Sequence, residues 1–595
     1  MSAIDTEGAV LALLGDEAVA LGAVHAGLSA AYGYPGTPST EILEYLIDES
    51  HEDGTSPFTA RWCANEKTAM EAALGSSFAG KRALVTMNHV GLNVAADPFI
   101  NSALLDINGG LVLAVADDPG MHSSQAEQDS RYLAAFALVP CLEPRNQQEA
   151  YDMCREAFEV SEKYRLPVML RLVTRLSHAR GAVRIAERAD RKAQNPLSVI
   201  KDKAHWTLLP AYARKNYIDL IEKQEALVSW SSVHNANSLE LEGRDQSFAV
   251  ITSGLGANYY EENLEDLVQS LGGKAPAHLH IGAYPIPGES VQKLCEKAEK
   301  VLVIEEGQPF IEERLRGLLP QGLAIFGRLN SGVSKGNSGN NRGEAFAVPR
   351  TGELNPDNVR KSLGLAPRPS ILEAPALAGT KVPELPGRPP QLCQGCPHAD
   401  SYQTINRAVA ELTQSAGPQG QGFPLDSDRS STAICADIGC YSLGATPPYS
   451  AIDSIVCMGA SIGMARGAAD AGIKYALAVI GDSTFLHSGM TGLVDAVQAD
   501  TPMTVIILDN SIVAMTGCQE TIVPSAQLAG LIRGLGVNPE HLLELEAKPQ
   551  FINENVGRLK KEMEYRGLSV IIFRRECIEA FRKRRKKAPQ DRSKV

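Results

Sequence analysis

Residues 475–519 read YALAVIGDSTFLHSGMTGLVDAVQADTPMTVIILDNSIVAMTGCQ and decide the fold. The apolar run Tyr475–Ile480 leads into Gly-Asp-Ser and a helical pattern, and a second apolar run, Met503–Leu508, ends at Asp-Asn. Short apolar runs separated by a helix are typical of buried parallel strands. Because such strands end at one edge of their sheet, we expect Asp482 and Asn510 to lie side by side there. A helix N-terminus at that edge favours phosphate.

This strand-end pair predicts a magnesium site. Asp482 and Asn510 offer two oxygen ligands, and Mg²⁺ is rarely bound by protein groups alone, so the pair suits a magnesium ion shared with a diphosphate. Gly-Asp-Ser alone is weak evidence for a cofactor site, because most such triplets are ordinary turns. The Asp-Asn strand end one βαβ unit later makes the pattern specific. The alternative is a doubly wound domain that binds no cofactor.

Composition excludes several classes of protein. The chain has 595 residues, 44% of them hydrophobic and 21% charged, which indicates a globular chain of several domains. Its net charge of −13 argues against a general nucleic-acid binder. Its apolar runs are of core size, shorter than a membrane span, and its start resembles no secretory signal. Eleven cysteines in so long a chain are not a disulfide scaffold, and we expect a reducing cytoplasm.

Strand and helix patterns alternate along the chain, which predicts an α/β protein with parallel sheets. We expect a first unit over 8–180, a connector and second unit over 181–330, and a third unit over 391–580. Residues 331–390 are rich in Gly, Asn, Ser and Pro and are predicted to be a linker. Residues 581–595 form a basic tail.

The cysteines of the third unit have a distinctive spacing. Cys393 and Cys396 form a CxxC pair, and Cys440 and Cys577 follow singly near strand ends. A CxxC pair alone fits a zinc half-site, a redox pair or iron–sulfur ligation. A zinc site would want a second close pair, which the sequence lacks. Two ligands from one loop and two from separate strand ends can surround a [4Fe–4S] cluster.

The strand–turn–helix–strand stretch resembles the thiamine diphosphate signature, in which Gly-Asp-Gly or Gly-Asp-Ser precedes a strand-end Asn. The string GDSTFLHSGMTGL…ILDNSIVAMTG is similar to the 2-oxoacid:ferredoxin oxidoreductases, and within them to the indolepyruvate branch. The resemblance covers almost the whole chain. It implies a thiamine diphosphate-binding fold with pyrimidine and diphosphate units and a transketolase C-terminal-like middle domain.

The resemblance assigns roles in the third unit. It implies that Asp482, Asn510 and the carbonyl of Ile512 hold Mg²⁺ against the diphosphate, with Gly481 and Ser483 in the cofactor-binding turn. It also implies one [4Fe–4S] cluster, whose ligands are the thiols of the family's CxGC pair, its Gly-Cys and its cysteine after the last strand. These are Cys393, Cys396, Cys440 and Cys577; the context of Cys577 departs from the family pattern, because Arg-Arg-Glu precedes it.

The resemblance also assigns the catalytic groups. The family's activating Glu, which contacts the aminopyrimidine ring, lies nine residues before a helical glycine, and WCANEKTAMEAALGSSFAGK matches with Glu66 and Gly75. Glu71 is the competing acid, further along the helix. Thr37, in YPGTPS, resembles the threonine that contacts the substrate carboxylate; capping the following helix is its alternative role. His487, just after Gly-Asp-Ser, is a candidate for the pocket.

Two further strings of the first unit, MNHVGLN and DDPGMHSSQ, also look like this family. Their polar residues fall at strand ends, so they either line the active cleft or serve a structural role. These residues are His89, Asn93, Asp117, His122 and Gln125.

The function implied is oxidative decarboxylation of aryl 2-oxoacids such as indolepyruvate to acyl-CoA, with electrons passed to ferredoxin or a similar acceptor. A non-oxidative thiamine-dependent decarboxylase or carboligase is the alternative, and a scaffold without cofactor is another. The family pairs this large subunit with a small (beta) subunit, which predicts a dimer of heterodimers in the cytoplasm. Members usually continue into a cysteine-rich ferredoxin-like segment. This sequence has no cysteine after Cys577, so we expect electrons to leave for another protein, which the basic tail would help to dock.

Overall fold

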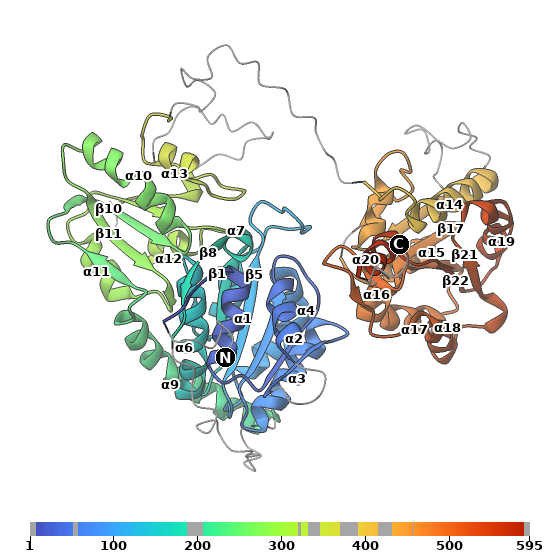
Figure 1. The fold of residues 1–595 in the computed structure, drawn as a ribbon, viewed down its shortest axis with the longest axis horizontal. Helices are drawn as coiled ribbons and strands as arrows, with labels where there is room; N and C mark the ends of the chain where they lie inside the picture. Colours follow the sequence, from blue (N-terminus) through green and yellow to red (C-terminus); the bar gives the residue numbers. More distant parts are fainter. Residues whose placement is uncertain are drawn as a thin grey trace, which may run out of the picture. The chain divides into compact units, whose positions relative to one another are not determined.

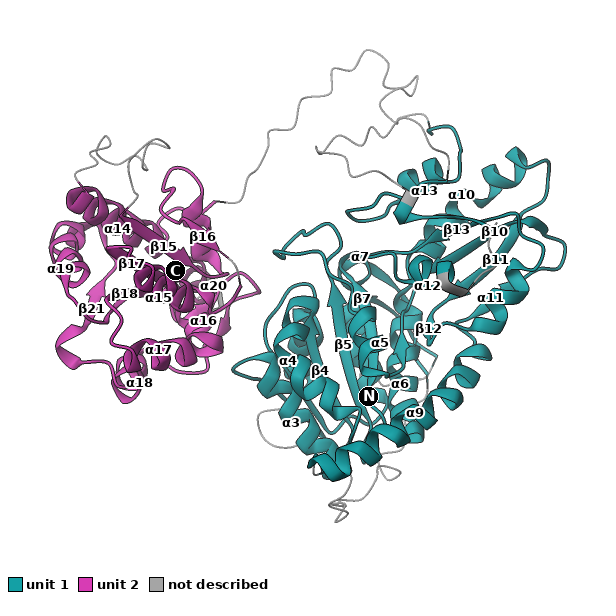
Figure 2. Ribbon diagram, turned by 180° about the vertical axis from the view of Figure 1, so that it is seen from behind, with its two compact units in different colours: residues 1–382 teal, residues 383–595 magenta. Residues whose placement is uncertain are grey.

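The structure is a computed structural model that describes residues 8–50, 57–186, 206, 208–318, 323–330, 346–368, 391–413, 431–455 and 457–587. The chain forms two compact units, Met1–Val382 and Pro383–Val595, coloured teal and magenta in Figure 2. The expected linker 331–390 falls mostly outside the described residues, and so do residues 588–595 of the expected tail.

The first unit contains a seven-stranded sheet with helices on both faces (Figure 1). Its strand order is β12-β6-β7-β5-β4-β2-β3, and neighbouring strands are parallel except for β12 and β6. Helices on both faces bury both sides of its central strands, which is why β5 is apolar at almost every position. The strands are β2(Ala30–Gly33), β3(Thr59–Trp62), β4(Ala83–Asn88), β5(Leu111–Asp117), β6(Cys141–Leu142), β7(Val168–Val173) and β12(Ala283–Tyr284).

Helices α1(Gly15–His25), α2(Thr40–Glu49), α3(Glu66–Phe78), α4(His89–Ser102), α5(Arg131–Ala137), α6(Gln147–Tyr164) and α7(Thr174–His178) accompany this sheet, and β1(Val10–Leu14) pairs with β8(Arg180–Arg184) beside it.

A second sheet of five strands completes the first unit, in the order β14-β13-β10-β11-β9. Strand β12 follows β11 in the chain but pairs with β6, so the two sheets share one continuous segment. The strands are β9(Ser238–Glu240), β10(Asp245–Ser253), β11(Pro276–Ile281), β13(Lys300–Ile304) and β14(Ala324–Phe326), and the helices are α9(Pro210–Ser232), α10(Gly256–Ser270), α11(Gly288–Cys295), α12(Phe310–Leu318) and α13(Pro356–Ser362).

The second unit is built on a six-stranded, fully parallel sheet, in the order β16-β15-β17-β18-β22-β21. Alternate residues of β17 enter two cores: Leu477 packs with α14 and α19, whereas Ala478 packs with α15, α17 and α18. The strands are β15(Thr432–Ala436), β16(Ser454–Ile455), β17(Tyr475–Gly481), β18(Met503–Asp509), β21(Leu542–Glu546) and β22(Ser569–Arg574).

Its helices are α14(Pro397–Thr413), α15(Ala460–Asp470), α16(Asp482–Thr484), α17(Met490–Gln498), α18(Ser525–Gly534), α19(Ile552–Glu564) and α20(Ile578–Lys587), and β19(Ile512–Val513) and β20(Gln519–Glu520) form a small hairpin.

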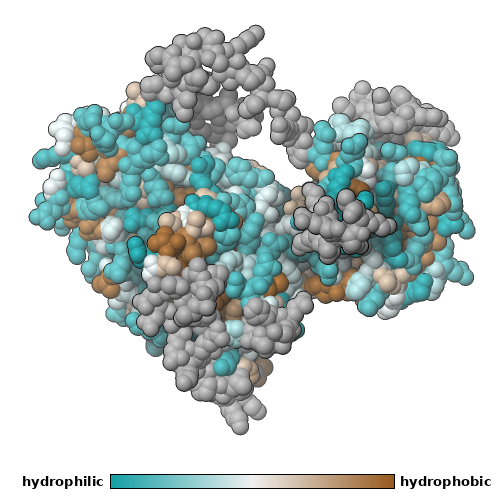
Figure 3. Space-filling model, in the orientation of Figure 1, coloured by the Kyte–Doolittle hydropathy of each residue, from teal (hydrophilic) through white to brown (hydrophobic). Residues whose placement is uncertain are grey.

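These sheets confirm the α/β class with parallel strands. The face drawn in Figure 3 is mainly hydrophilic, with apolar residues in scattered groups. None of the helices in the described ranges combines the length and apolar composition that a bilayer crossing requires. The expected unit boundaries stay predictions. Described residues 346–368 carry α13, whose Arg360 pairs with Asp266 of α10, and residues 581–587 belong to α20.

Candidate active site

The carboxyl edge of the second unit's sheet gathers the polar residues expected from the sequence. Gly481 lies level with Leu508 in the pairing of β17 and β18, so Asp482 and Asn510 follow neighbouring strand ends. The Asp482 carboxylate is buried and accepts hydrogen bonds from the backbone N–H groups of Ser483 (2.9 Å) and Ser511 (2.8 Å). The strand ends therefore bring the predicted magnesium ligands together.

A second carboxylate lies beside Asp482. Burial, followed by the neighbouring Asp509 carboxylate, raises the pKa of Asp482 well above its usual range. Arg574 pairs with Asp509 at 3.0 Å, whereas the donors to Asp482 are backbone N–H groups. A bound cation would favour the ionised form of Asp482. Carboxylate, amide and carbonyl oxygens are also the donors that Mg²⁺ prefers, so this edge fits a magnesium–diphosphate group.

Asn510 is held by groups on both sides. Its Oδ1 accepts from the backbone N–H of Ile512 (3.1 Å), and its Nδ2 lies 3.3 Å from Nε2 of His398. Burial lowers the pKa of His398 to about 4, so its imidazole is neutral and can accept this hydrogen bond. His398 follows the CxxC pair and was not assigned a role from sequence.

Asp437 is a further acid that the sequence did not single out. Its carboxylate accepts from the N–H (2.8 Å) and the hydroxyl (2.6 Å) of Ser461, in the first turn of α15. Burial raises its pKa to about 6. Asp437 directly follows β15, so a strand end followed by an acid was the signal that could have found it.

The turn after Asp482 is shaped by close packing. Residues Phe485–Gly489 form a π-helical turn, a feature often found at functional sites. It carries the buried His487, whose Nδ1 is hydrogen-bonded to the Ser488 hydroxyl. A Cβ at Gly481 would lie 2.5 Å from the ring of Tyr441, so only glycine fits there. His487 therefore lies in the turn that follows the predicted ligand Asp482.

Five thiols share one neighbourhood in the second unit. Burial raises the pKa of Cys440 to about 12, and the thiols of Cys396, Cys577, Cys393 and Cys518 contribute to the rise. Burial likewise raises the pKa of Cys396 to about 11, with Cys393 and Cys577 contributing. The four predicted cluster ligands and Cys518, which was not assigned a role from sequence, therefore lie in the same region of the second unit.

The position of Cys577 ties these thiols to the strand edge. Its backbone N–H donates to the carbonyl of Asn510 (3.2 Å), so it directly adjoins the predicted magnesium ligand. Four thiols match the donor chemistry of a [4Fe–4S] cluster. Among the described residues, no three or more His, Cys, Asp or Glu side chains are grouped closely enough to hold a metal ion. The thiols are neighbours without a closed ligand shell.

The first unit places Glu66 at the start of α3. Its side chain is buried against the first turn of α4: a Cβ at Gly91 would lie 2.5 Å from Glu66 Oε1. Two helix N-termini therefore meet at this carboxylate, a favourable setting for negative charge. Glu71, the competing acid, is half-exposed and pairs with Lys67. Burial and setting favour Glu66 as the functional acid.

The loop that carries Thr37 is held in place by several hydrogen bonds. Asn88, at the end of β4, donates to the Thr37 carbonyl (3.0 Å), and Gly36 N–H donates to the Thr40 hydroxyl (3.1 Å). The Ser39 hydroxyl donates back to the Gly36 carbonyl (2.9 Å), and α2 has no side-chain cap at its N-cap, Ser39. A capping role for Thr37 is therefore not observed.

The remaining candidates of the first unit separate into two groups. His89 is buried, with Nε2 2.8 Å from the carbonyl of Ala126. Asn93, His122 and Gln125 are exposed. Asp117 is fully buried and pairs with Arg171 at 2.7 Å. The contacts of Asp117 therefore support a structural role rather than a place in the active cleft.

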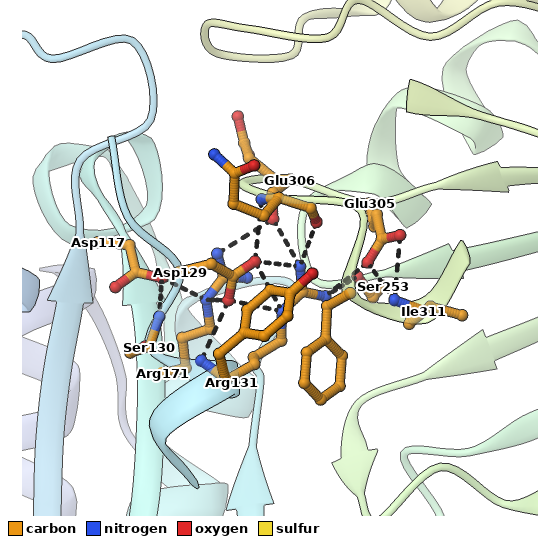
Figure 4. Close-up of polar contacts among 12 residues, drawn as sticks. Asp117, Asp129, Ser130, Arg131, Arg171, Ser253, Glu305, Glu306 and Ile311 are labelled. Carbon is orange, nitrogen blue, oxygen red and sulfur yellow. Dashed lines mark hydrogen bonds and ion pairs between the residues drawn. The ribbon is translucent and has the colours of Figure 1, made fainter. Parts of the chain in front are cut away.

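Asp117 belongs to a buried charge network between the two sheets of the first unit (Figure 4). Arg131 bonds Asp129 (2.6 Å) and the carbonyl of Glu306 (3.0 Å), and Arg171 bonds the same carbonyl (3.1 Å). The network comprises the carboxyl groups of Asp117, Asp129, Glu143, Glu305 and Glu306 and the guanidinium groups of Arg131, Arg171 and Arg328, all buried. It joins the carboxyl ends of β5 and β7 to those of β10 and β13.

Comparisons with known proteins agree with this geometry. Residues 21–217 match the family model "Pyruvate flavodoxin/ferredoxin oxidoreductase, thiamine diP-bdg", and residues 437–542 match "Thiamine pyrophosphate enzyme, C-terminal TPP binding domain". Proteins named indolepyruvate oxidoreductase subunit IorA are 36% identical in Archaeoglobus fulgidus, 34% in Methanothermobacter thermautotrophicus and 34% in Pyrococcus abyssi. Each alignment covers 96% of this chain and 86–87% of the relative.

The chain belongs to the indolepyruvate oxidoreductase subunit IorA family. It is therefore a subunit of a thiamine diphosphate-dependent 2-oxoacid oxidoreductase, and the recognition and the enzyme class predicted from its sequence are confirmed. The second family match begins at Asp437 and includes Asp482 and Asn510, and the first includes Thr37 and Glu66.

Proposed function

We propose that this chain is the large subunit of an enzyme that oxidises aryl 2-oxoacids such as indolepyruvate. The balanced reaction is R–CO–COO⁻ + CoA–SH → R–CO–S–CoA + CO₂ + H⁺ + 2 e⁻. The C–C bond to the carboxylate breaks, a thioester C–S bond forms, and the two electrons go to ferredoxin or a similar acceptor. The aryl preference is supported by the name of the relatives, indolepyruvate oxidoreductase.

One observation carries the oxidative part of this proposal. The four thiols predicted to hold an iron–sulfur cluster share a neighbourhood, and one of them, Cys577, hydrogen-bonds the residue predicted to hold magnesium. A non-oxidative decarboxylase needs no group that removes electrons. Thiols beside the diphosphate edge therefore favour oxidation over simple decarboxylation.

In the second unit, Asp482, Asn510 and the carbonyl of Ile512 hold Mg²⁺ against the diphosphate, and Gly481 and Ser483 form the turn around it. Thiamine diphosphate, when bound, supplies the electron sink for the carbon that loses CO₂. Neutral His398 orients Asn510 through the 3.3 Å contact. His487, in the π-helical turn after Asp482, is our candidate for a group that contacts the substrate.

In the first unit, Glu66 binds N1′ of the aminopyrimidine and moves a proton at that atom. Its buried position between two helix N-termini holds the carboxylate in one orientation. Thr37 binds the substrate carboxylate, and its loop is kept in position by Asn88. Orientation by fixed groups of this kind lowers the entropic cost of reaction.

Cys393, Cys396, Cys440 and Cys577 would hold one [4Fe–4S] cluster, which would supply one-electron redox chemistry. A small (beta) subunit completes the enzyme, as the name "subunit" of the relatives supports, and the assembly is a dimer of heterodimers in the cytoplasm. Neither nucleic acid nor a membrane takes part.

The test is turnover of a 2-oxoacid panel by the complex with its small subunit under anaerobic conditions. Indolepyruvate should give CO₂, indoleacetyl-CoA and reduced acceptor in the ratio of the equation above, with higher kcat/KM than pyruvate or 2-oxoglutarate. Release of CO₂ with an aldehyde product and no reduced acceptor would overturn the proposal in favour of the non-oxidative alternative.

A further inference from the structure

Helix α20 is strongly basic, although the chain as a whole is acidic. It begins at Ile578, directly after Cys577, and ends at Lys587. Its basic residues are Arg582, Lys583, Arg584, Arg585, Lys586 and Lys587, against one acid, Glu579. The whole chain has a net charge of −13, so this helix is a local positive surface on an acidic protein.

The middle of α20 is open to solvent. Residues 581–585 are exposed, and the side chains of Arg582 and Arg584 are 51% and 70% exposed. Arg582 pairs with Glu579 and Arg584 with Glu576. Such exposed pairs contribute little to stability, so an incoming carboxylate can replace them. Phe581, 42% exposed, adds an apolar contact beside the charges.

The helix borders the group of thiols. Phe581 N–H donates to the Cys577 carbonyl (3.1 Å), and Lys583 Nζ donates to the carbonyl of Gly517 (2.7 Å), which precedes Cys518. Burial raises the pKa of the Cys518 thiol, and the positive charge of Lys583 opposes that rise. The thiols of Cys577 and Cys393 also contribute to the rise. Cys393 itself is exposed. A partner bound to α20 would therefore lie next to the solvent-facing side of the thiols.

We propose that α20 is the docking surface for an acidic, one-electron-accepting iron–sulfur protein. The inference rests on the proposed function, in which each turnover releases two electrons that reduce two oxidised acceptor molecules. Complementary charge raises association rates and orients the partner, and the effect falls as salt screens it. Placing the positive surface beside the thiols would bring the acceptor's redox centre to the point where electrons leave.

The experiment compares three versions of the full chain in complex with its small subunit. The docking variant is Arg582→Gln/Arg584→Gln/Arg585→Gln. The matched control is Arg558→Gln/Lys560→Gln/Lys561→Gln, which removes three positive charges from α19 of the same unit. An acidic [4Fe–4S] ferredoxin and the small dye methyl viologen serve as acceptors.

The docking variant should lose about tenfold in kcat/KM for ferredoxin at low salt, and its rate should depend less on salt. Its reduction of methyl viologen and the behaviour of the α19 control should match wild type. Equal losses with both acceptors, or the same ferredoxin loss in the control, would overturn the inference.

Binding of oxidised ferredoxin without substrate, measured by calorimetry, separates this inference from the proposed function. Docking predicts about tenfold weaker binding by the Arg582/Arg584/Arg585 variant even if turnover fails for another reason. Unchanged ferredoxin affinity in the variant would contradict the inference. So would a wild-type protein that binds duplex DNA more tightly than ferredoxin, if the same variant abolished the DNA binding.

Discussion

Two pairs of buried aspartates, one pair in each unit, differ in their partners. In the first unit, Asp117 and Asp129 lie against the guanidinium groups of Arg171 and Arg131. In the second unit, Asp482 and Asp437 are equally buried, but within the described residues they receive N–H and O–H donors and no ion pair. The ion-paired acids, Asp117 and Asp129, are therefore expected to support the fold. Asp482 and Asp437, which lack an ion pair within the described residues, are expected to be available to a ligand.

Physical chemistry explains this contrast. A buried charge without a partner is costly, so proteins pair such groups or neutralise them by protonation. Burial and the neighbouring Asp509 raise the pKa of Asp482, and a bound cation would oppose that rise by stabilising the ionised carboxylate. In the first unit, Arg171 and Arg131 satisfy Asp117 and Asp129 internally. Cation binding is therefore expected beside Asp482, which has no ion pair within the described residues.

The largest effect is expected at Glu66, the one functional acid that we assign to the first unit. Glu66→Gln keeps the shape of the side chain but removes its ability to exchange a proton with the aminopyrimidine. We expect kcat to fall by about 10²–10⁴-fold, with cofactor binding retained. Steady-state kinetics and calorimetry measure the two properties.

Glu71→Gln is the matched control, because Glu71 lies on the same helix and is half-exposed. It should change kcat by less than about twofold, as expected for a surface substitution away from the reacting groups. A large loss in Glu71→Gln with normal activity in Glu66→Gln would exchange the two assignments.

The buried network should contribute to stability rather than to chemistry. Arg171→Met leaves Asp117 buried without its ion-pair partner and removes one of the partners of Glu143, which should cost about 3–5 kcal/mol of the unfolding free energy of the first unit. Adding Asp117→Leu should recover part of the loss. Calorimetry would show the first unit melting earlier and the second unit unchanged; an unchanged first unit would mean that these pairs are not needed for its stability.

Asp482 should control cofactor affinity. Asp482→Asn removes the charge that attracts Mg²⁺, and we expect thiamine diphosphate with magnesium to bind at least about tenfold more weakly. Asp495→Asn, on the exposed side of α17 where Asp495 pairs with Arg466, is the control and should bind normally. Wild-type affinity in Asp482→Asn would remove Asp482 from the metal site.

The smallest effect concerns pH. Burial raises the pKa of both Glu305 and Glu306 to about 7, above the usual value of 4.5. The folded first unit therefore holds more protons than the unfolded chain between these values, and its stability should fall as pH rises from 4.5 through 7. The melting temperature of the first unit should be lower at pH 8 than at pH 5.5.

The double variant Glu305→Gln/Glu306→Gln cannot titrate at these positions and should flatten that pH dependence. The same slope in the double variant as in wild type would assign the dependence to other groups.

Much of the site follows from sequence because it is local. Strand periodicity with Gly-Asp-Ser and Asp-Asn at strand ends places Asp482 beside Asn510, and the structure has them there. Cys393 and Cys577 also contribute to the raised pKa of the Cys396 thiol, as expected for thiols in the same region. Whether these residues bind magnesium and a cluster stays a prediction.

Contacts between distant segments could not be predicted from the sequence. The partners of Arg131 include Ser253, Tyr284 and Glu305, more than a hundred residues away, and no periodicity records such pairs. Asp437 and His398 likewise gain their roles only when α15 and β18 pack beside them. Tertiary packing, rather than local propensity, decides which buried acids are paired.

We predict that the second unit's edge carries a redox cluster beside the cofactor. The most direct test of this prediction is the iron and acid-labile sulfide content of anaerobically purified protein, with electron paramagnetic resonance after addition of a 2-oxoacid and coenzyme A. We predict about four iron and four sulfide per chain and a reduced-cluster signal, both lost in Cys440→Ser and kept in Cys295→Ser. Bound thiamine diphosphate with CO₂ release but no iron in the wild-type protein would contradict the account.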